Sequence, residues 1–83
     1  MKKARVKVPW PEGLHLRRAV QLVKTAQRFR CVLQIRSEER IADLRSLLSV
    51  IALCAAMGAT LDLEAAGDDE QEALQTVQQL FDA

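Results

Sequence analysis

Aromatic side chains are scarce in this sequence of 83 residues, which contains no tyrosine, two phenylalanines and one tryptophan. Proteins that bind single-stranded RNA usually stack its bases on several aromatic rings. The basic first third of the chain suggests a small RNA-binding domain, but the shortage of aromatic residues argues against one. We therefore expect no nucleic-acid partner.

Cysteine is equally scarce, and the only two cysteines, Cys31 and Cys54, are far apart in the sequence. A secreted domain of this size usually needs several disulfide bonds, so the composition favours the reducing cytoplasm. Each cysteine is expected to be a small buried residue. Together with a single histidine they do not form a zinc-binding pattern, and we expect neither a metal nor a cofactor.

Long apolar segments are absent as well. No run is apolar enough to cross a bilayer, and no secretory core follows the basic start Met1-Lys2-Lys3. The length allows one small domain over residues 1–83, with a monomer as the simplest expectation. The sequence has no acid–base pair, nucleophile triad or glycine-rich phosphate loop, so we do not expect an independent enzyme.

The charges that are present are distributed unevenly. Nine of the twelve Lys and Arg residues lie between Met1 and Arg30, where Glu12 is the only acidic residue. From Leu61 onward there are seven acidic residues and no basic one. A shared basic face would attract an acidic protein or a phosphate, and ordinary solvated charge explains most of these residues equally well.

The hydrophobic periodicity predicts four strands and three helices. Period-two alternation predicts strands over residues 4–8, 31–36, 40–43 and 60–65. Helical spacing predicts helices over residues 16–28, 47–53 and 70–81. Ser46 is expected to cap the second helix, and Asp69 with Glu72 to form a capping box on the third. The order β-α-β-β-α-β-α predicts an α+β fold, in which helices cover one face of an antiparallel sheet in two layers.

The single histidine lies in Gly13-Leu14-His15-Leu16-Arg17, between a turn-forming segment and the first predicted helix. The start of a helix has free backbone N–H groups that bind anions. Neutral imidazole is also a nucleophile near neutral pH. The arrangement favours a phosphohistidine site, and the alternative is a surface residue without a special role.

Three segments in register resemble the HPr family, the histidine-containing phosphocarrier proteins of the bacterial phosphotransferase system. They are Gly13-Leu14-His15-Leu16-Arg17, Arg45-Ser46-Leu47-Leu48 and Gly67-Asp68-Asp69-Glu70-Gln71. The resemblance implies an open-faced two-layer sandwich, with a four-stranded antiparallel sheet covered on one face by three helices. It also implies that His15 takes a phosphoryl group from phosphorylated enzyme I, which phosphoenolpyruvate has charged, and passes it to a sugar-specific or regulatory acceptor protein.

The resemblance assigns further roles to individual residues. Arg17 carries over as the guanidinium that faces the phosphoryl group, and Ser46 as the serine that a dedicated kinase phosphorylates in some bacteria. A helix-surface arginine and a plain helix cap are the alternatives. A surface that binds enzyme I is implied on the first two helices, although core packing explains any one of its residues equally well. Its expected members are Leu16, Val20, Lys24, Leu47, Leu48 and Ile51.

The sequence departs from the family pattern around the histidine. Arg18 replaces a usual proline, Leu16 a smaller residue, and Cys54 a frequent glycine. Glu12 places a carboxylate close to the site, where it would repel a phosphoryl dianion if it pointed inward. These departures leave an alternative function open: an HPr-like module that binds a regulatory protein without carrying phosphate.

Overall fold

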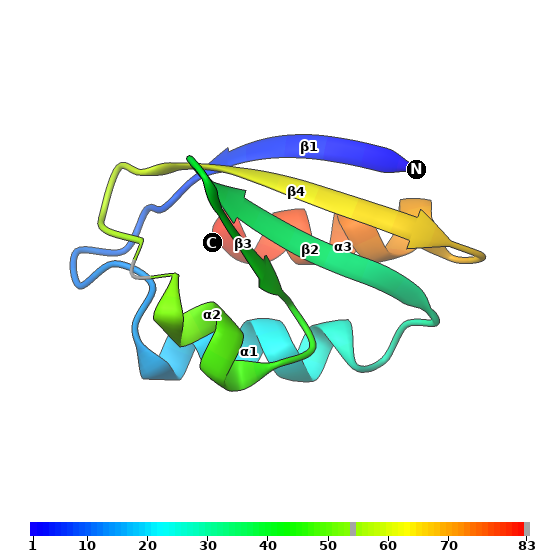
Figure 1. Cartoon of the computed structure of the whole chain (residues 1–83), viewed down its shortest axis with the longest axis horizontal. Helices are drawn as coiled ribbons and strands as arrows, with labels where there is room; N and C mark the ends of the chain where they lie inside the picture. Colours follow the sequence, from blue (N-terminus) through cyan, green and yellow to red (C-terminus); the bar gives the residue numbers. More distant parts are fainter. Residues whose placement is uncertain (54, 83) are drawn as a thin grey trace.

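The computed structural model describes residues 1–53 and 55–82 and has the predicted order of elements (Figure 1). Cys54, whose burial and effect on the second helix were predicted, lies outside the described residues. The elements are β1 (Lys2–Lys7), α1 (Leu16–Ala26), β2 (Cys31–Ser37), β3 (Arg40–Asp43), α2 (Leu47–Ala52), β4 (Thr60–Gly67) and α3 (Glu70–Phe81).

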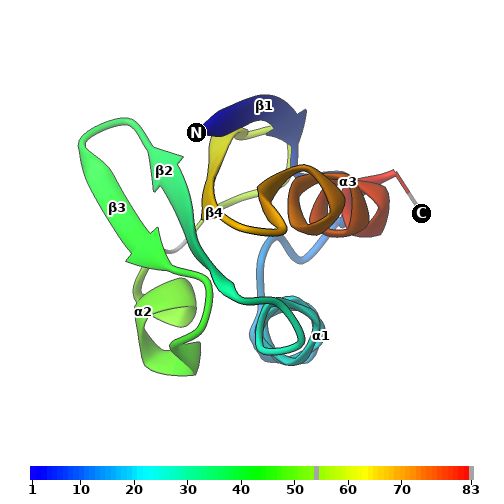
Figure 2. The same ribbon diagram turned by 90° about the vertical axis from the view of Figure 1, so that its right-hand side faces the viewer.

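The four strands form one antiparallel sheet in the order β1-β4-β2-β3. The β2–β3 hairpin turns at Glu38, which has a positive φ of 55°. All three helices lie on the same face of the sheet, and the other face is open (Figure 2). The predicted α+β open-faced sandwich is confirmed.

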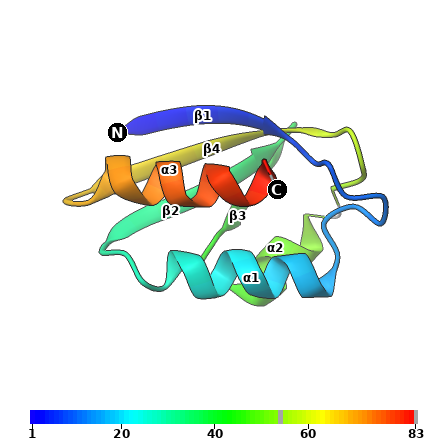
Figure 3. The same ribbon diagram turned by 180° about the vertical axis from the view of Figure 1, so that it is seen from behind.

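The core lies between the sheet and the helices. Residues on alternate positions of β2 and β4 point into it, and α1 and α3 cover them from the other side (Figure 3). The largest fully buried side chains are Leu22, Leu33, Ile35, Leu44, Leu61, Leu63, Val8, Val50 and Val77. Each such residue contributes about 1.5–3 kcal/mol by leaving water, so this layer supplies most of the stability.

Several element boundaries differ from the prediction. Strand β1 spans Lys2–Lys7 instead of residues 4–8, β2 ends at Ser37 instead of residue 36, and α2 ends at Ala52 instead of residue 53. Helix α1 ends at Ala26 instead of Arg28, since Phe29 is buried and its N–H donates to the Ala26 carbonyl in a turn toward β2. Strand β4 continues to Gly67 because it pairs with residues 31–36 of β2, where Cys31 lies opposite Gly67. The end of α1 and the end of β4 are therefore set by contacts with the rest of the fold, and local periodicity does not define them.

The predicted capping box at the start of α3 is wrong. Asp69 stands at the N-cap position, but its side chain makes no cap hydrogen bond. Its Oδ2 accepts from the backbone N–H of Arg30 at 2.8 Å, which joins α3 to the start of β2. The next residue, Glu70, accepts from the N–H of Gly67 at 3.2 Å and pairs with the chain's N-terminus at 3.1 Å. The Asp69 carboxylate thus binds a backbone N–H that lies far away in the sequence, and the local capping motif does not reveal this partner.

Candidate functional site

The segment before α1, here called the His15 loop (residues 9–15), is held by backbone hydrogen bonds. The N–H of Gly13 donates to the carbonyl of Trp10, and the N–H of Leu14 donates to the carbonyl of Ala55. Gly13 has a φ of 76°, and a Cβ there would lie 2.6 Å from the Ala55 oxygen. Only glycine meets both conditions, so this residue sets the path of the chain into the histidine.

His15 is the N-cap residue of α1. Its extended backbone (φ −92°, ψ −178°) lets its carbonyl accept from the N–H of Ala19, while the imidazole makes no cap hydrogen bond. The side chain is 37% exposed, so a ring nitrogen can be reached from solvent. The first backbone N–H groups of α1 have no partner within the helix, which is the condition for binding an anion beside the ring.

Two charged side chains flank the ring in the sequence, and the structure places them differently. The Glu12 Oε2 atom lies 3.6 Å from His15 Nε2, so the predicted proximity of this carboxylate is real. Arg17 is exposed on the first turn of α1, and its side chain has no hydrogen bond or ion pair with the rest of residues 1–53 and 55–82. Its guanidinium is therefore available for an incoming anion.

Arg18, which replaces the usual proline, is directed to Trp10. Its guanidinium carbon lies 5.0 Å from the centre of the Trp10 ring, and its Nη1 donates to the side chain of Gln21 at 3.1 Å. Trp10 is buried and its ring centre lies 5.1 Å from that of Phe81 at the end of α3. Arg18 and Trp10 thus tie the His15 loop to α1 and α3, a role that the sequence pattern did not reveal.

The surface implied for a protein partner is only partly exposed. Leu48 is 79% exposed on α2 and Leu16 is 58% exposed on α1, which packs against α2. Lys24 is exposed further along α1. The other three residues, Val20, Leu47 and Ile51, are half-buried, and Leu47 and Ile51 pack against the core. The patch, defined by Leu16, Leu48 and these three residues, adjoins His15.

The sequence analysis missed one exposed apolar residue near this end of the molecule. Met57 is 60% exposed in the segment between α2 and β4. That segment contacts the His15 loop, because Leu14 donates to Ala55 and Gly58 donates to the carbonyl of Val8. Met57 lies in a loop without hydrophobic periodicity, so no sequence signal marked it.

Ser46 caps α2, as predicted. Its Oγ accepts from the N–H of Ser49 at 3.4 Å, and its own N–H donates to the carbonyl of Asp43. The neighbouring Arg45 is directed elsewhere, since its Nη1 donates to the carbonyl of Phe29 at 3.1 Å. The hydroxyl is half-buried and already used as an acceptor.

The groups with perturbed pKa values lie where β2 and α3 begin, and this end of the sheet is opposite the start of α1 (Figure 1). Burial, together with a hydrogen bond to the Asp69 carboxylate, raises the pKa of Cys31 to about 11. The N–H of Arg30 lowers the pKa of Asp69, and that of Gly67 lowers the pKa of Glu70. These shifts reflect the junction of β2, β4 and α3, and they do not mark a reactive centre.

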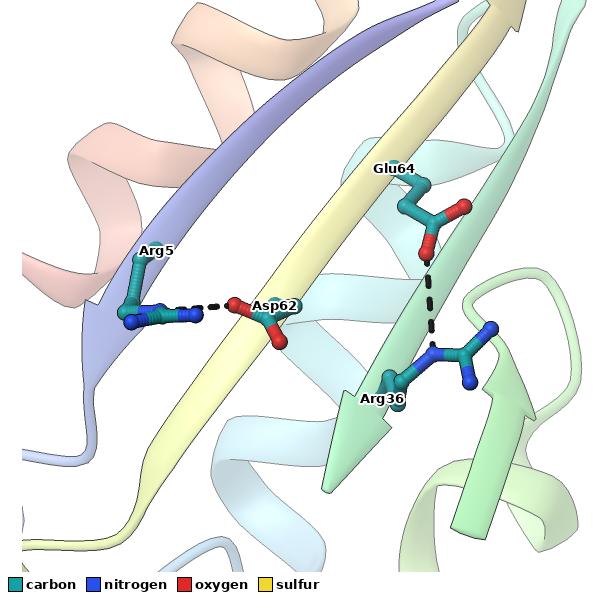
Figure 4. A network of polar contacts seen from close by, with 4 residues as sticks. All are labelled: Arg5, Arg36, Asp62 and Glu64. Carbon is teal, nitrogen blue, oxygen red and sulfur yellow. Dashed lines mark hydrogen bonds and ion pairs between the residues drawn. The ribbon is translucent and has the colours of Figure 1, made fainter. Parts of the chain in front are cut away.

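A hollow of about 440 Å³ lies on the open face of the sheet, lined by Lys3, Ala4, Arg5, Arg36, Asp62 and Glu64. Its charges are paired across neighbouring strands: Arg5 with Asp62 at 2.9 Å, and Arg36 with Glu64 at 3.7 Å (Figure 4). These two pairs neutralise four of the charged lining residues, and Lys3 is the charged lining residue without an ion-pair partner among residues 1–53 and 55–82. The reactive side chain lies in the His15 loop instead.

The described residues contain no group of three or more His, Cys, Asp or Glu side chains that could hold a metal ion. None of the helices in this part of the chain has the length and hydrophobicity needed to traverse a bilayer.

Comparison with known proteins shows one family along almost the whole chain. The family model "PTS HPr component phosphorylation site" matches residues 2–83. A protein named phosphocarrier protein HPr from Lysinibacillus sphaericus is 36% identical over 81 residues, covering 98% of this chain and 92% of the relative. A protein of the same name from Cupriavidus necator is 37% identical over 62 residues, covering 75% of this chain and 70% of the relative.

Solved structures agree with this result. A crystal structure named HPr-C-His from Thermoanaerobacter tengcongensis is similar with a TM-score of 0.95 and 28% identity, covering 99% of this chain and 92% of that one. A phosphocarrier protein HPr from Bacillus anthracis has a TM-score of 0.91 and 25% identity, covering 96% of this chain and 95% of that one. The backbone of this chain is thus similar to the backbones of those proteins, despite their low sequence identity.

Proposed function

Because the chain belongs to the HPr family of the bacterial phosphotransferase system, we propose that it is a phosphocarrier. It accepts a phosphoryl group on His15 from phosphorylated enzyme I and passes the group to a downstream sugar-specific or regulatory acceptor protein. The observation that carries the proposal is the partly exposed imidazole of His15 at the open N-terminus of α1.

The chemistry requires few groups on the carrier. The lone pair of a ring nitrogen forms the bond to phosphorus while the bond between phosphorus and the donor breaks, and that electron pair stays with the donor. The free N–H groups of α1 and the guanidinium of Arg17 neutralise the dianion that results. In the onward step the N–P bond breaks and its electron pair returns to the ring. Neither step needs a metal or cofactor on this protein.

The apolar patch and Lys24 are proposed to bind enzyme I. Leu16 exposes apolar surface next to His15, and Leu48 exposes apolar surface on α2, which packs against α1. Exposed apolar surface is the property expected of a protein contact on a small domain. Phosphate placed on Ser46 by a serine kinase would add negative charge inside this surface and weaken the contact. We place the protein in the cytoplasm as a monomer, where the free thiol of Cys31 stays reduced.

Incubation with enzyme I and phosphoenolpyruvate tests the proposal. Intact-mass measurement is expected to show one phosphoryl group per chain, lost on acid treatment and absent in His15→Ala. A chain that never gains this group from its cognate enzyme I is not a phosphocarrier. If His15→Ala still binds its partner and supports the normal cellular phenotype, the protein is an interaction module that does not carry phosphate.

A further inference from the structure

The side chains of Glu12 and His15 are in contact because the chain turns between these two residues. The Oε2 atom of Glu12 lies 3.6 Å from Nε2 of His15, and the two side chains are 70% and 37% exposed. The positive φ of Gly13 and the bond from the His15 N–H to the Gly13 carbonyl bend the chain so that positions 12 and 15 meet. At 3.6 Å the contact is longer than a hydrogen bond and acts through charge.

The side of the ring that Glu12 faces has a chemical consequence. A carboxylate close to Nε2 favours the tautomer that carries the proton on Nε2, and this tautomer has its lone pair on Nδ1. A phosphoryl dianion on Nε2 would lie against the carboxylate, whereas one on Nδ1 lies across the ring from it. The repulsion between the Glu12 carboxylate and a phosphoryl group is therefore weaker when the group is on Nδ1 and stronger when it is on Nε2.

We propose that Glu12 is a positioning residue for His15: it keeps the proton on Nε2, directs phosphorylation to Nδ1, and stabilises the positive charge that the ring then acquires. This inference rests on the proposed function of His15 as the phosphoryl acceptor. When Nδ1 forms its bond to phosphorus, Nε2 keeps its proton and the ring becomes cationic. When the phosphoryl group leaves, the electron pair of the N–P bond returns to Nδ1 and the ring is neutral again.

The surroundings of the ring make Glu12 the acidic group that matters. The other charged residues close to His15 in the chain, Arg17 and Arg18, lie on α1, and Arg18 is held by Trp10 and Gln21. The described residues 55–59, which bond to the His15 loop, carry no charge. A cationic phosphoimidazole therefore has one carboxylate beside Nε2, and protonation of Nε2 makes the ring a better leaving group.

The first test measures the tautomer of the unphosphorylated ring. Long-range ¹H–¹⁵N NMR of His15, above the pH at which the ring is protonated, is expected to show the Nε2–H tautomer in the wild type. In Glu12→Ala the ratio of Nδ1–H to Nε2–H tautomer should rise about two- to fivefold, the size typical of an exposed charge contact. Glu12→Gln also removes the charge and should raise the ratio by a similar amount, because at 3.6 Å the contact acts through charge.

The second test measures the phosphorylated protein, prepared with enzyme I and phosphoenolpyruvate. Hydrolysis of phospho-His15 at neutral pH is expected to slow about two- to fivefold in both Glu12→Ala and Glu12→Gln, because both variants lose the charge that favours the protonated ring. In strong acid, where every ring is protonated, the rates should converge. Glu39→Ala, which removes an exposed glutamate from the β2–β3 turn, is the matched control and should match the wild type.

The outcomes separate this inference from the proposed function. If the wild type is not phosphorylated, the phosphocarrier proposal fails, and the tautomer ratio still decides whether Glu12 orients the ring. An Nδ1–H tautomer that dominates in the wild type, or a ratio that Glu12→Ala leaves unchanged, overturns the role of Glu12. Equal hydrolysis rates at neutral pH overturn its role in the phosphorylated state.

Discussion

At the scale of single residues, the site depends on a few side chains whose positions are set by the turn before α1. The geometry of a helix start supplies donors, but it does not decide which way His15 faces. Gly13 decides that, because its backbone conformation and its close approach to Ala55 leave no room for a side chain. Residue identity at this one position therefore controls access to the imidazole.

Gly13→Ala is expected to destabilise the protein by about 1–3 kcal/mol and to slow phosphorylation, since the new Cβ meets the Ala55 carbonyl. Urea denaturation and the rate of phosphorylation by enzyme I measure the two effects. Gly58→Ala is a matched control: it has a similar φ of 84° but no atom within 4 Å of the new Cβ. Gly58→Ala should lower the free energy of unfolding by about 1 kcal/mol and leave the phosphorylation rate unchanged. Equal losses of stability and rate in both variants would contradict the explanation by a clash with Ala55.

Arg17→Ala should slow phosphorylation about 10- to 100-fold, because a charged hydrogen bond to the phosphoryl group is worth about 1.5–3 kcal/mol. Stability should hardly change, since the side chain is exposed and unpaired within the described part of the chain. Stopped-flow or quench-flow phosphorylation with enzyme I gives the rate. Arg28→Ala removes an arginine that lies 6.0 Å over the Phe29 ring near the other end of α1, and it should retain the wild-type rate.

At the scale of elements, each helix combines a core face with a second role. Val50 anchors α2 in the core, while Leu48 on the same short helix is largely exposed. The sequence shows that α2 is apolar apart from Ser49, but it does not tell which residues the neighbouring α1 covers. The exposed residues are thus a result of how α1 and α2 pack.

Leu48→Asp is expected to weaken binding to enzyme I by about tenfold or more, since apolar anchors carry most of the energy of a small interface. The free energy of unfolding should change by no more than about 0.5 kcal/mol, because the side chain is exposed. Titration calorimetry with enzyme I and urea denaturation provide the two values. Val32→Asp, at an exposed position of β2, is the control, and loss of binding there as well would rule out a localised surface.

At the scale of the whole molecule, the two ends of the sheet have different physical roles. One end carries His15 and the apolar patch, and the other joins Cys31, Asp69, Glu70 and the N-terminus through hydrogen bonds and ion pairs. The second end has the altered pKa values, and it holds β1, β2 and α3 together. The residues that join the strands to α3 therefore lie at one end of the sheet, and His15 lies at the other end.

The hydrogen bond to the Asp69 carboxylate predicts how the free energy of unfolding depends on pH. The N–H of Arg30 lowers the pKa of Asp69 from its ordinary value of 3.8, so the folded state binds this proton less readily than the unfolded chain does. The resulting stability is present above about pH 4 and is lost as the pH falls through the lowered pKa. Urea midpoints measured from about pH 7 to pH 2 should fall more steeply for the wild type than for Asp69→Asn. Parallel curves would show that the Asp69 charge contributes nothing.

The sequence by itself determined the order of the elements and the place of the histidine. Alternation and helical spacing are local properties, so the strand at Arg40–Asp43, the Ser46 cap and the start of α1 after His15 could all be predicted. The general α+β class followed from that order, and the family resemblance added the sheet with three helices on one face.

Only the tertiary structure decided which distant groups meet. It paired β1 with β4 and placed Ala55 against Gly13. It also drew the Asp69 carboxylate away from its own helix to Arg30, and placed Arg18 on Trp10. These contacts join residues up to tens of positions apart, and their partners depend on how the layers pack, which no short-range pattern encodes. The side of the imidazole that faces Glu12 belongs with them, because a three-residue spacing becomes a contact only when the turn at Gly13 has formed.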